Sequence, residues 1–171
     1  MRRKHLLIGN TTFVLQILQT MPKIEAHEEA ATRNQTVLSN LLKNYDTSPD
    51  DFASWVVTVA FYKALHLVEG IFYMDGMLSQ EKRPFHSKDH KERNQRLKDI
   101  KKFGHIWKNY RPLFEASMVA RYLFDPNSGA EQANLNTYLS GNSVYGQFIN
   151  HHLRQIEKSF DVKKADYSQC K

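Results

Sequence analysis

Six polar side chains recur at helical spacing along an otherwise apolar stretch of the chain: Ser54, Thr58, Tyr62, His66, Glu69 and Tyr73. Their steps of four, four, four, three and four residues place this polar ribbon on one face of a helix, within roughly 120°. His66 and Glu69 lie within one turn of each other, so the carboxylate could orient the imidazole for general acid-base chemistry. The alternative is that the polar ribbon is simply the solvent face of the helix.

A second row of useful side chains follows further along the chain: Tyr110, Phe114, Ser117, Arg121 and Tyr122. The first four recur at steps of four, three and four residues, so they share a face of another helix, with Tyr122 beside them. Arg121 is flanked by apolar residues, and a guanidinium in such a setting requires an anionic partner. We expect this partner to be either Glu69 or a phosphate group.

Two histidines and an arginine, His86, His90 and Arg93, lie between these two rows. Imidazoles four residues apart can bind one metal ion, but a metal site needs a third ligand, for which His66 is the core candidate. The surrounding stretch is rich in lysine and arginine and more simply predicts a surface that attracts phosphate. We therefore expect no metal and no cofactor, and a histidine-metal helical bundle stays as an alternative.

The formal net charge of +6 and the pI of about 9.4 favour polyanionic partners over cationic ligands. RNA, nucleotides and acidic protein partners all fit this charge. Cys170 is the only cysteine of the chain, which excludes an intrachain disulfide and a multi-cysteine zinc site. A reducing compartment is implied, and we expect a cytoplasmic protein.

The first twenty residues combine a basic start with an apolar stretch. Four polar residues interrupt this stretch: Asn10, Thr11, Thr12 and Gln16. No small-x-small cleavage site follows, so we expect neither a signal peptide nor a membrane span. Met21 opens a segment that itself reads like a protein start. We interpret residues 1–20 as an N-terminal extension or an ordinary packed helix, residues 21–162 as one helical domain and residues 163–171 as a polar tail.

Apolar periodicity and turn residues divide the chain into helices. We expect them over about residues 24–45, 49–74, 88–102, 107–124 and 143–160. The second is apolar around most of its circumference, which is typical of a central helix. Ser48 and Ser87 are the expected caps of the second and third helices, and Asp125 to Gly129 predict a turn. The expected fold is all-α, an antiparallel bundle of four to five helices.

Three segments resemble the core pattern of bacterial HEPN-domain proteins. They are Trp55 to Glu69, with Phe-Tyr-x-Ala-x-His, then His86 to Arg93, and then Tyr110 to Tyr122, with Ser-x-x-x-Arg-Tyr. The resemblance covers about residues 25–125. It implies a helical bundle, usually dimeric, in a family where many members are metal-independent ribonucleases of toxin-antitoxin and phage-defence systems. Other members are non-catalytic nucleotide-binding or partner modules.

In nuclease members of that family, an arginine is followed by four to six residues and then a catalytic histidine. Arg83 and His90 match this spacing, with six residues between them, whereas Arg121 has no histidine downstream at that distance. The resemblance therefore supports the fold more strongly than it supports ribonuclease activity.

The leading hypothesis is a HEPN-like homodimer that binds RNA or nucleotide phosphates and, as a ribonuclease, uses a histidine to activate the 2′-hydroxyl while an arginine stabilises the transition state. The expected catalytic residues are His66, Glu69, His90, Arg93 and Arg121. The expected substrate-binding residues are Tyr62, His86, Tyr110, Ser117 and Tyr122. The alternative from another class is a non-catalytic module that binds a nucleotidyltransferase, a defence ATPase or another polypeptide. A cognate antitoxin or a defence protein is the expected kind of protein partner.

Overall fold

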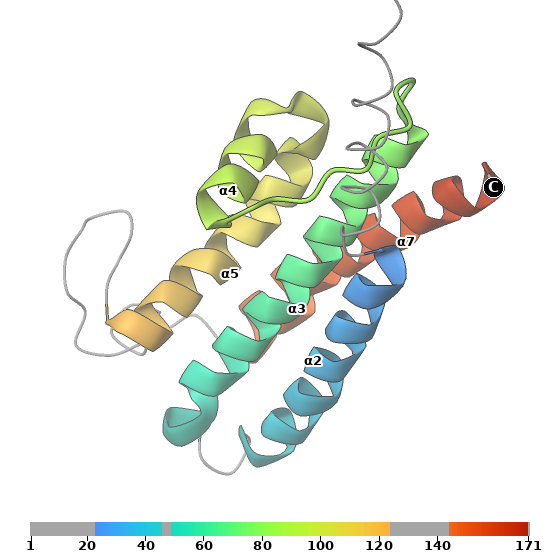
Figure 1. Ribbon diagram of the computed structural model, residues 1–171. Helices are drawn as coiled ribbons and strands as arrows, with labels where there is room; N and C mark the ends of the chain where they lie inside the picture. Colours follow the sequence, from blue (N-terminus) through green and yellow to red (C-terminus); the bar gives the residue numbers. More distant parts are fainter. Residues whose placement is uncertain (1–22, 46–48, 124–143, 171) are drawn as a thin grey trace, which may run out of the picture.

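The chain is helical throughout the part that the computed structural model describes, which comprises residues 23–45, 49–123 and 144–170. Five α-helices, one 3₁₀ turn and one π-helix follow one another, and no strand occurs among the described residues (Figure 1). They are α2 (Ile24–Tyr45), α3 (Pro49–Leu78), α4 (His90–Asp99), η1 (Lys101–Phe103), α5 (Gly104–Tyr122), the π-helix η2 (Val144–Leu153) and α7 (Arg154–Gln169). The prediction of an all-α helical bundle is confirmed.

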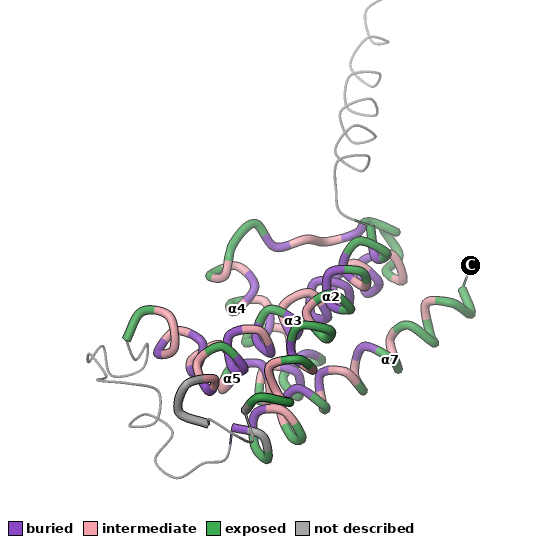
Figure 2. The backbone as a smooth tube through the Cα atoms, turned by 90° about the horizontal axis from the view of Figure 1, so that it is seen from below, coloured by how far each residue is buried: buried purple, intermediate pink, exposed green. Residues whose placement is uncertain are grey.

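Helix α3 is the central element, and it packs against α2, α5 and α7. Val56, Val57, Ala60 and Phe61 are completely buried, and buried positions run along α3 on several sides (Figure 2). Phe52–Leu78 is long and apolar enough to cross a membrane by length and composition alone, but 72% of its most apolar window is buried inside the protein. The apolar circumference of α3 is thus used for packing, as expected of a central helix.

Helices α2 and α7 cover the central helix with one apolar stripe each. In α2, Ala30, Ala31 and Leu38 are buried, while the remaining faces carry charged and polar residues. In α7, the ring of Phe160 lies on Gly70 of α3, where a Cβ atom would approach it to 2.6 Å. Glycine at this position therefore lets the two helices come close together.

The start of α4 differs from the expected one. Asp89, not Ser87, caps this helix: its carboxylate accepts a hydrogen bond from the backbone N–H of Glu92 at 2.8 Å. The carboxylate of Glu92 in turn accepts from the N–H of Lys88 at 2.8 Å, which completes a capping arrangement. Helix α4 consequently spans only His90–Asp99, inside the expected range of 88–102.

The later helices also have bounds that differ from the predicted ones. Helix α5 begins at Gly104, three residues before the expected start, and contains Pro112. It ends at Tyr122, where Leu123 adopts a left-handed conformation (φ 53°) and donates its N–H to the Val119 carbonyl. The polar tail predicted over residues 163–171 continues α7 as far as Gln169. The predicted leader (1–20), the Ser48 cap and the turn at 125–129 lie outside the described residues.

Candidate functional site

A buried ion pair between α3 and α4 forms the centre of the candidate site. Glu69 and Arg93 are only 1% and 5% exposed, and the Nε of Arg93 donates to Glu69 Oε1 at 2.6 Å. The other carboxylate oxygen, Oε2, accepts the backbone N–H of Ser87 at 2.9 Å. Both oxygens of Glu69 are therefore used to hold α4 and the segment before it against α3.

The role expected for Glu69 as the partner of His66 does not match this geometry. The hydrogen bonds of the carboxylate go to Arg93 and Ser87, and the nearest imidazole nitrogen in ion-pair range is Nε2 of His86, at 3.9 Å from Oε2. Glu69 is thus a structural anion. Its ion pair also corrects the expectation that Glu69 could be the partner of Arg121.

Three histidines gather beside this ion pair: His27 of α2, His66 of α3 and His86 of the segment before α4. The Nδ1 atoms of His27 and His66 are 3.4 Å apart, and the rings of His27 and His86 stack with centroids 5.2 Å apart. Burial, followed by the neighbouring His86, lowers the pKa of His27 from 6.5 to about 4. Burial and then Arg93 lower the pKa of His66. Both rings are therefore neutral at pH 7.

His27 was not among the predicted site residues. It lies one turn after Ile24 and one turn before Ala30 and Ala31, and all four are buried. The sequence signal that could have identified His27 was therefore a histidine on the apolar stripe of α2. Its neighbours His66 and His86 come from other segments of the chain. Only the packing of α2 on α3 brings them together.

His90 lies at the start of α4, and a contact with Arg93 determines which of its ring nitrogens carries the proton. Nη1 of Arg93 is 3.0 Å from Nδ1 of His90. Arginine has N–H donors only, so Nδ1 must be the acceptor, and the proton of the neutral ring must be on Nε2. Burial, followed by Arg93 and then Arg121, lowers the pKa of His90. The ring, which packs on Phe61 and Phe114, is therefore a neutral N–H donor.

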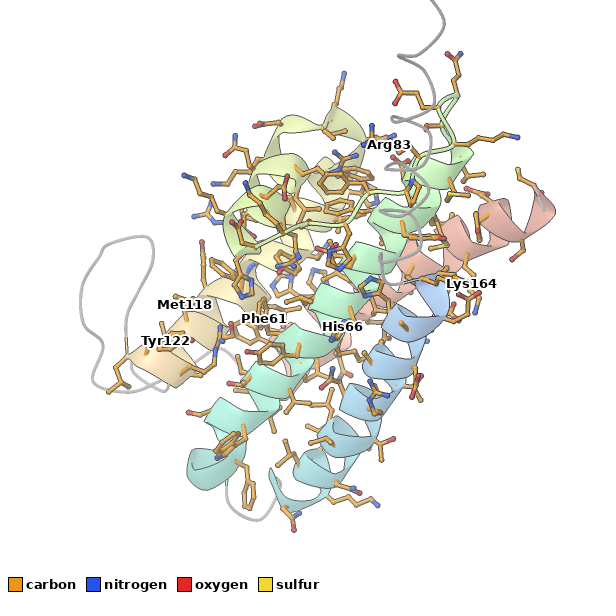
Figure 3. All side chains as sticks on the ribbon, in the orientation of Figure 1. Phe61, His66, Arg83, Met118, Tyr122 and Lys164 are labelled. Atoms are coloured by element: carbon orange, nitrogen blue, oxygen red, sulfur yellow. The ribbon has the colours of Figure 1, made fainter. Side chains whose placement is uncertain are left out.

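Among the described residues, the hydrogen-bond partners of Arg121 are all neutral groups. Its Nη1 donates to the hydroxyl of Tyr62 at 3.0 Å, and its Nε donates to the Ser117 carbonyl at 3.1 Å. The guanidinium carbon lies 5.4 Å from the Phe61 ring centroid and 4.9 Å from that of Tyr122. Within the described part of the chain, no carboxylate forms an ion pair with Arg121. Figure 3 shows Phe61 on α3 near the middle of the molecule and Tyr122 at the end of α5.

Tyr110 and Ser117 are too deeply buried to contact a ligand, since neither is exposed. Burial raises the pKa of the Tyr110 phenol, an effect that Arg93 partly opposes. The Ser117 hydroxyl donates to the Phe114 carbonyl at 2.8 Å and lies 3.3 Å from Nη2 of Arg121. Both residues can position others, whereas Tyr62 and Tyr122 keep 36% and 61% exposure and can meet a ligand.

Arg83 and His90, which match the arginine-to-histidine spacing of the family, lie against different parts of α3. The carbonyl of Arg83 packs against Gly76, at 2.3 Å from where a Cβ atom would lie, whereas the ring of His90 packs on Phe61. Gly76 and Phe61 are fifteen residues apart on α3, which corresponds to roughly 22 Å. Figure 3 accordingly shows Arg83 and Phe61 at opposite parts of the central helix.

The polar ribbon of α3 is not a continuous solvent face. Thr58 and Glu69 are buried, Ser54, His66 and Tyr73 are half-buried, and Tyr62 is exposed.

Among the described residues, no group of three or more histidine, cysteine, aspartate or glutamate side chains is arranged to hold a metal ion. The structure thus brings together His66, Glu69, His86 and Arg93 as an inner cluster, and His90, Tyr62, Arg121 and Tyr122 as an outer one.

Comparisons of the chain with protein-family models, with curated proteins and with solved structures gave no match. The geometry of the site is therefore what supports a functional conclusion.

Proposed function

We propose that the chain is a HEPN-like domain, an antiparallel helical bundle that binds RNA or nucleotide phosphates at the outer cluster. The observation that carries this proposal is the state of Arg121, a half-buried guanidinium that neutral groups hold in place and that forms no ion pair with a described carboxylate. Guanidinium groups bind phosphate oxygens through two parallel N–H donors. A phosphate here would supply the missing negative charge.

His90 supports the same ligand. Its neutral ring offers Nε2–H as a donor, since Arg93 occupies Nδ1. The ring of His90 and the guanidinium of Arg121 both pack on Phe61, at 5.7 Å and 5.4 Å from its ring centroid, so the two groups are near each other. A neutral imidazole donor and a guanidinium can bind one anion together without the desolvation cost of a second buried positive charge.

Binding is better supported than histidine-dependent cleavage. A general base needs a free ring nitrogen, and His90 in its neutral form has none, because Nδ1 accepts from Arg93 and Nε2 carries the proton. His66 is the remaining candidate to activate a 2′-hydroxyl, with Arg121 stabilising the transition state. The ribonuclease version of the proposal therefore depends on His66.

The experiment is a titration of a fluorescein-labelled single-stranded RNA followed by anisotropy. We expect Arg121→Gln to weaken binding at least tenfold, about 1.4 kcal/mol, and Arg121→Lys to restore only part, because lysine lacks the planar pair of donors. Lys91→Gln, which removes an exposed charge from α4, is the matched control. Equal loss in Lys91→Gln and Arg121→Gln would contradict a specific site at Arg121.

Cleavage is tested separately with a generic RNA and the variants His66→Ala, His90→Ala and Arg121→Ala. If the wild-type protein cleaves and none of the three changes the rate, the ribonuclease version is wrong. Growth arrest on expression, relieved by a neighbouring gene product, would support a toxin with a cognate antitoxin.

A second candidate, the non-catalytic module that binds a protein partner or a second copy of the chain, is favoured by exposed apolar side chains. Trp55, Tyr122 and Val162 are each more than 60% exposed. Isolated exposed apolar residues are common on monomers, so self-association has to be measured directly, as the oligomeric state by light scattering. A monomer whose mass is unchanged over a hundredfold concentration range would contradict the homodimer.

A further inference from the structure

A second cationic hollow lies at the C-terminal end of α3, whereas Arg121 packs on Phe61 near the middle of this helix. It has a volume of about 680 Å³ and is bounded by the end of α3, by the segment that leads to α4 and by α4 itself. Its charged lining consists of Asp75, Glu81, Arg83, Arg96 and Lys102, with His86 at the side toward the inner cluster. This hollow includes none of the residues assigned to the outer cluster.

Arg96 is the least satisfied cation of this hollow. Its guanidinium carbon lies 3.7 Å from the centroid of the Phe85 ring and 5.3 Å from that of Phe72. Its Nε atom is buried and has no hydrogen-bond partner, and no carboxylate of the described residues forms an ion pair with it. Burial lowers the pKa of Arg96. A buried, unpaired donor next to a hollow is an unusual arrangement, because such groups normally find a partner.

The acidic groups of the hollow offset this charge only in part. Both oxygens of Asp75 are taken by lysines, Oδ2 by Lys102 at 2.7 Å and Oδ1 by Lys163 at 3.6 Å. Glu81 is exposed, as is Arg83. Arg83 and Arg96 therefore outnumber the remaining acid of the hollow, Glu81, although Asp75 and Glu92 also act electrostatically on Arg96.

The hollow and the outer cluster are aligned on one face of α3. Arg121 lies 5.4 Å from the ring centroid of Phe61, and Arg96 lies 5.3 Å from that of Phe72. Phe61 and Phe72 are eleven residues apart, which is three helical turns and roughly 16 Å. Between them the charge of Arg93 is neutralised by Glu69. Two guanidinium groups that form no ion pair with a described carboxylate thus lie on phenylalanine rings three turns apart on the same face of α3.

We infer that Arg96 and Arg83 form a second phosphate site, and that the ligand is single-stranded RNA whose backbone phosphates occupy both this site and the one at Arg121. The inference rests on the proposed phosphate binding at Arg121, which it extends. The adjacent phosphates of one nucleotide cannot span the distance between Phe61 and Phe72. A strand with several phosphates can span this distance, and both guanidinium groups then receive an anion.

Nuclear magnetic resonance of the arginine Nε–H groups tests each site by its own signal. The probes are inorganic phosphate and a single-stranded RNA dodecamer. We expect the Arg96 signal to shift with both probes, and with the dodecamer at a concentration at least tenfold lower. An unchanged Arg96 signal overturns the second site. An unchanged Arg121 signal contradicts the proposed function instead, so the two failures are distinguishable.

Variants give an independent readout. The logarithm of the affinity for a single strand falls with the logarithm of the salt concentration by about 0.7 for each phosphate contact. Arg96→Gln and Arg83→Gln should each reduce this slope by about that amount, and the exposed Arg83 provides the result even if Arg96→Gln disturbs folding. An equal reduction in Lys91→Gln, or no reduction in Arg83→Gln and Arg96→Gln, would overturn the second site.

Discussion

Arg93 Nη1 lies 3.0 Å from Nδ1 of His90, and this contact determines which nitrogen of the neutral imidazole carries the proton. Because a guanidinium can only donate, the lone pair of Nδ1 is used and the proton belongs to Nε2. The same arginine donates its Nε to Glu69. One side chain thus connects the buried carboxylate to the histidine of the proposed binding surface.

The first prediction concerns the tautomer of His90. Two-bond ¹⁵N–¹H correlation spectra at pH 7 should show the Nε2–H form, since the pKa of His90 is lowered. In Arg93→Met the constraint on Nδ1 is lost, and the spectrum should show a mixture of tautomers. A pure Nδ1–H form in the wild-type protein would contradict the donor role of His90.

The second prediction concerns the cost of breaking the buried ion pair. Glu69→Gln leaves the Arg93 guanidinium buried without a counter-charge, and we expect the free energy of unfolding to fall by about 3 to 5 kcal/mol. The double variant Glu69→Gln/Arg93→Met removes both charges and should recover part of this loss. Urea unfolding of the wild-type protein, Glu69→Gln, Arg93→Met and the double variant measures the coupling energy between the two side chains.

A matched control is the exposed pair of Arg33 and Glu29 on α2, whose side chains are 65% and 71% exposed. Glu29→Gln should change stability by less than about 1 kcal/mol, as expected for a surface pair. If Glu69→Gln and Glu29→Gln had similar effects, the central structural role of Glu69 would be wrong.

The described helices that the sequence predicted well are those with strong local signals. The bounds of α2, Ile24–Tyr45, match the expected range of 24–45, because buried Ala30, Ala31 and Leu38 repeat at helical spacing within a polar sequence. The expected start of α3 at Pro49 also agrees. Its end does not, since the helix continues from Met74 to Leu78 through Gly76, where glycine is needed for the close approach of another segment.

The arrangement of the site depended on tertiary packing that sequence spacing does not contain. Arg121 was the arginine considered as a partner for Glu69, but the position of α4 brings Arg93 to this carboxylate instead. Serine is a favoured residue type for a helix cap, but the backbone N–H of Ser87 donates to Glu69. Asp89 caps α4 instead. In each case a contact between segments far apart in the sequence overrode a local preference.

The third prediction concerns stability in acid. The folded pKa of His27, about 4, is below the ordinary value of 6.5, so the unfolded state binds more protons between these values. Stability is therefore fully present above pH 6.5 and is lost as the pH falls toward 4, by roughly 3 kcal/mol for this residue. In His27→Gln, the slope of unfolding free energy against pH should decrease in this window.

His105, an exposed residue at the start of α5, provides the control for this experiment. His105→Gln should leave the slope of the wild-type protein unchanged. A slope that is equally steep in His27→Gln would show that the buried histidine is not responsible for the acid sensitivity.

The fourth prediction concerns two glycines with opposite surroundings. A Cβ atom at Gly76 would lie 2.3 Å from the Arg83 carbonyl and 3.0 Å from the Phe85 nitrogen, both backbone atoms that cannot rotate away. Gly76→Ala must therefore push the segment before α4 off the end of α3, and we expect a loss of about 1 to 3 kcal/mol. At Gly104 nothing lies within 4 Å of the added atom. Gly104→Ala should thus be neutral or stabilising by up to about 1 kcal/mol.

The same two variants should differ in RNA binding. Because Arg83 and Phe85 line the second hollow, Gly76→Ala should weaken RNA binding, whereas Gly104→Ala should not. Thermal unfolding measures the effect on stability, and anisotropy measures the effect on binding.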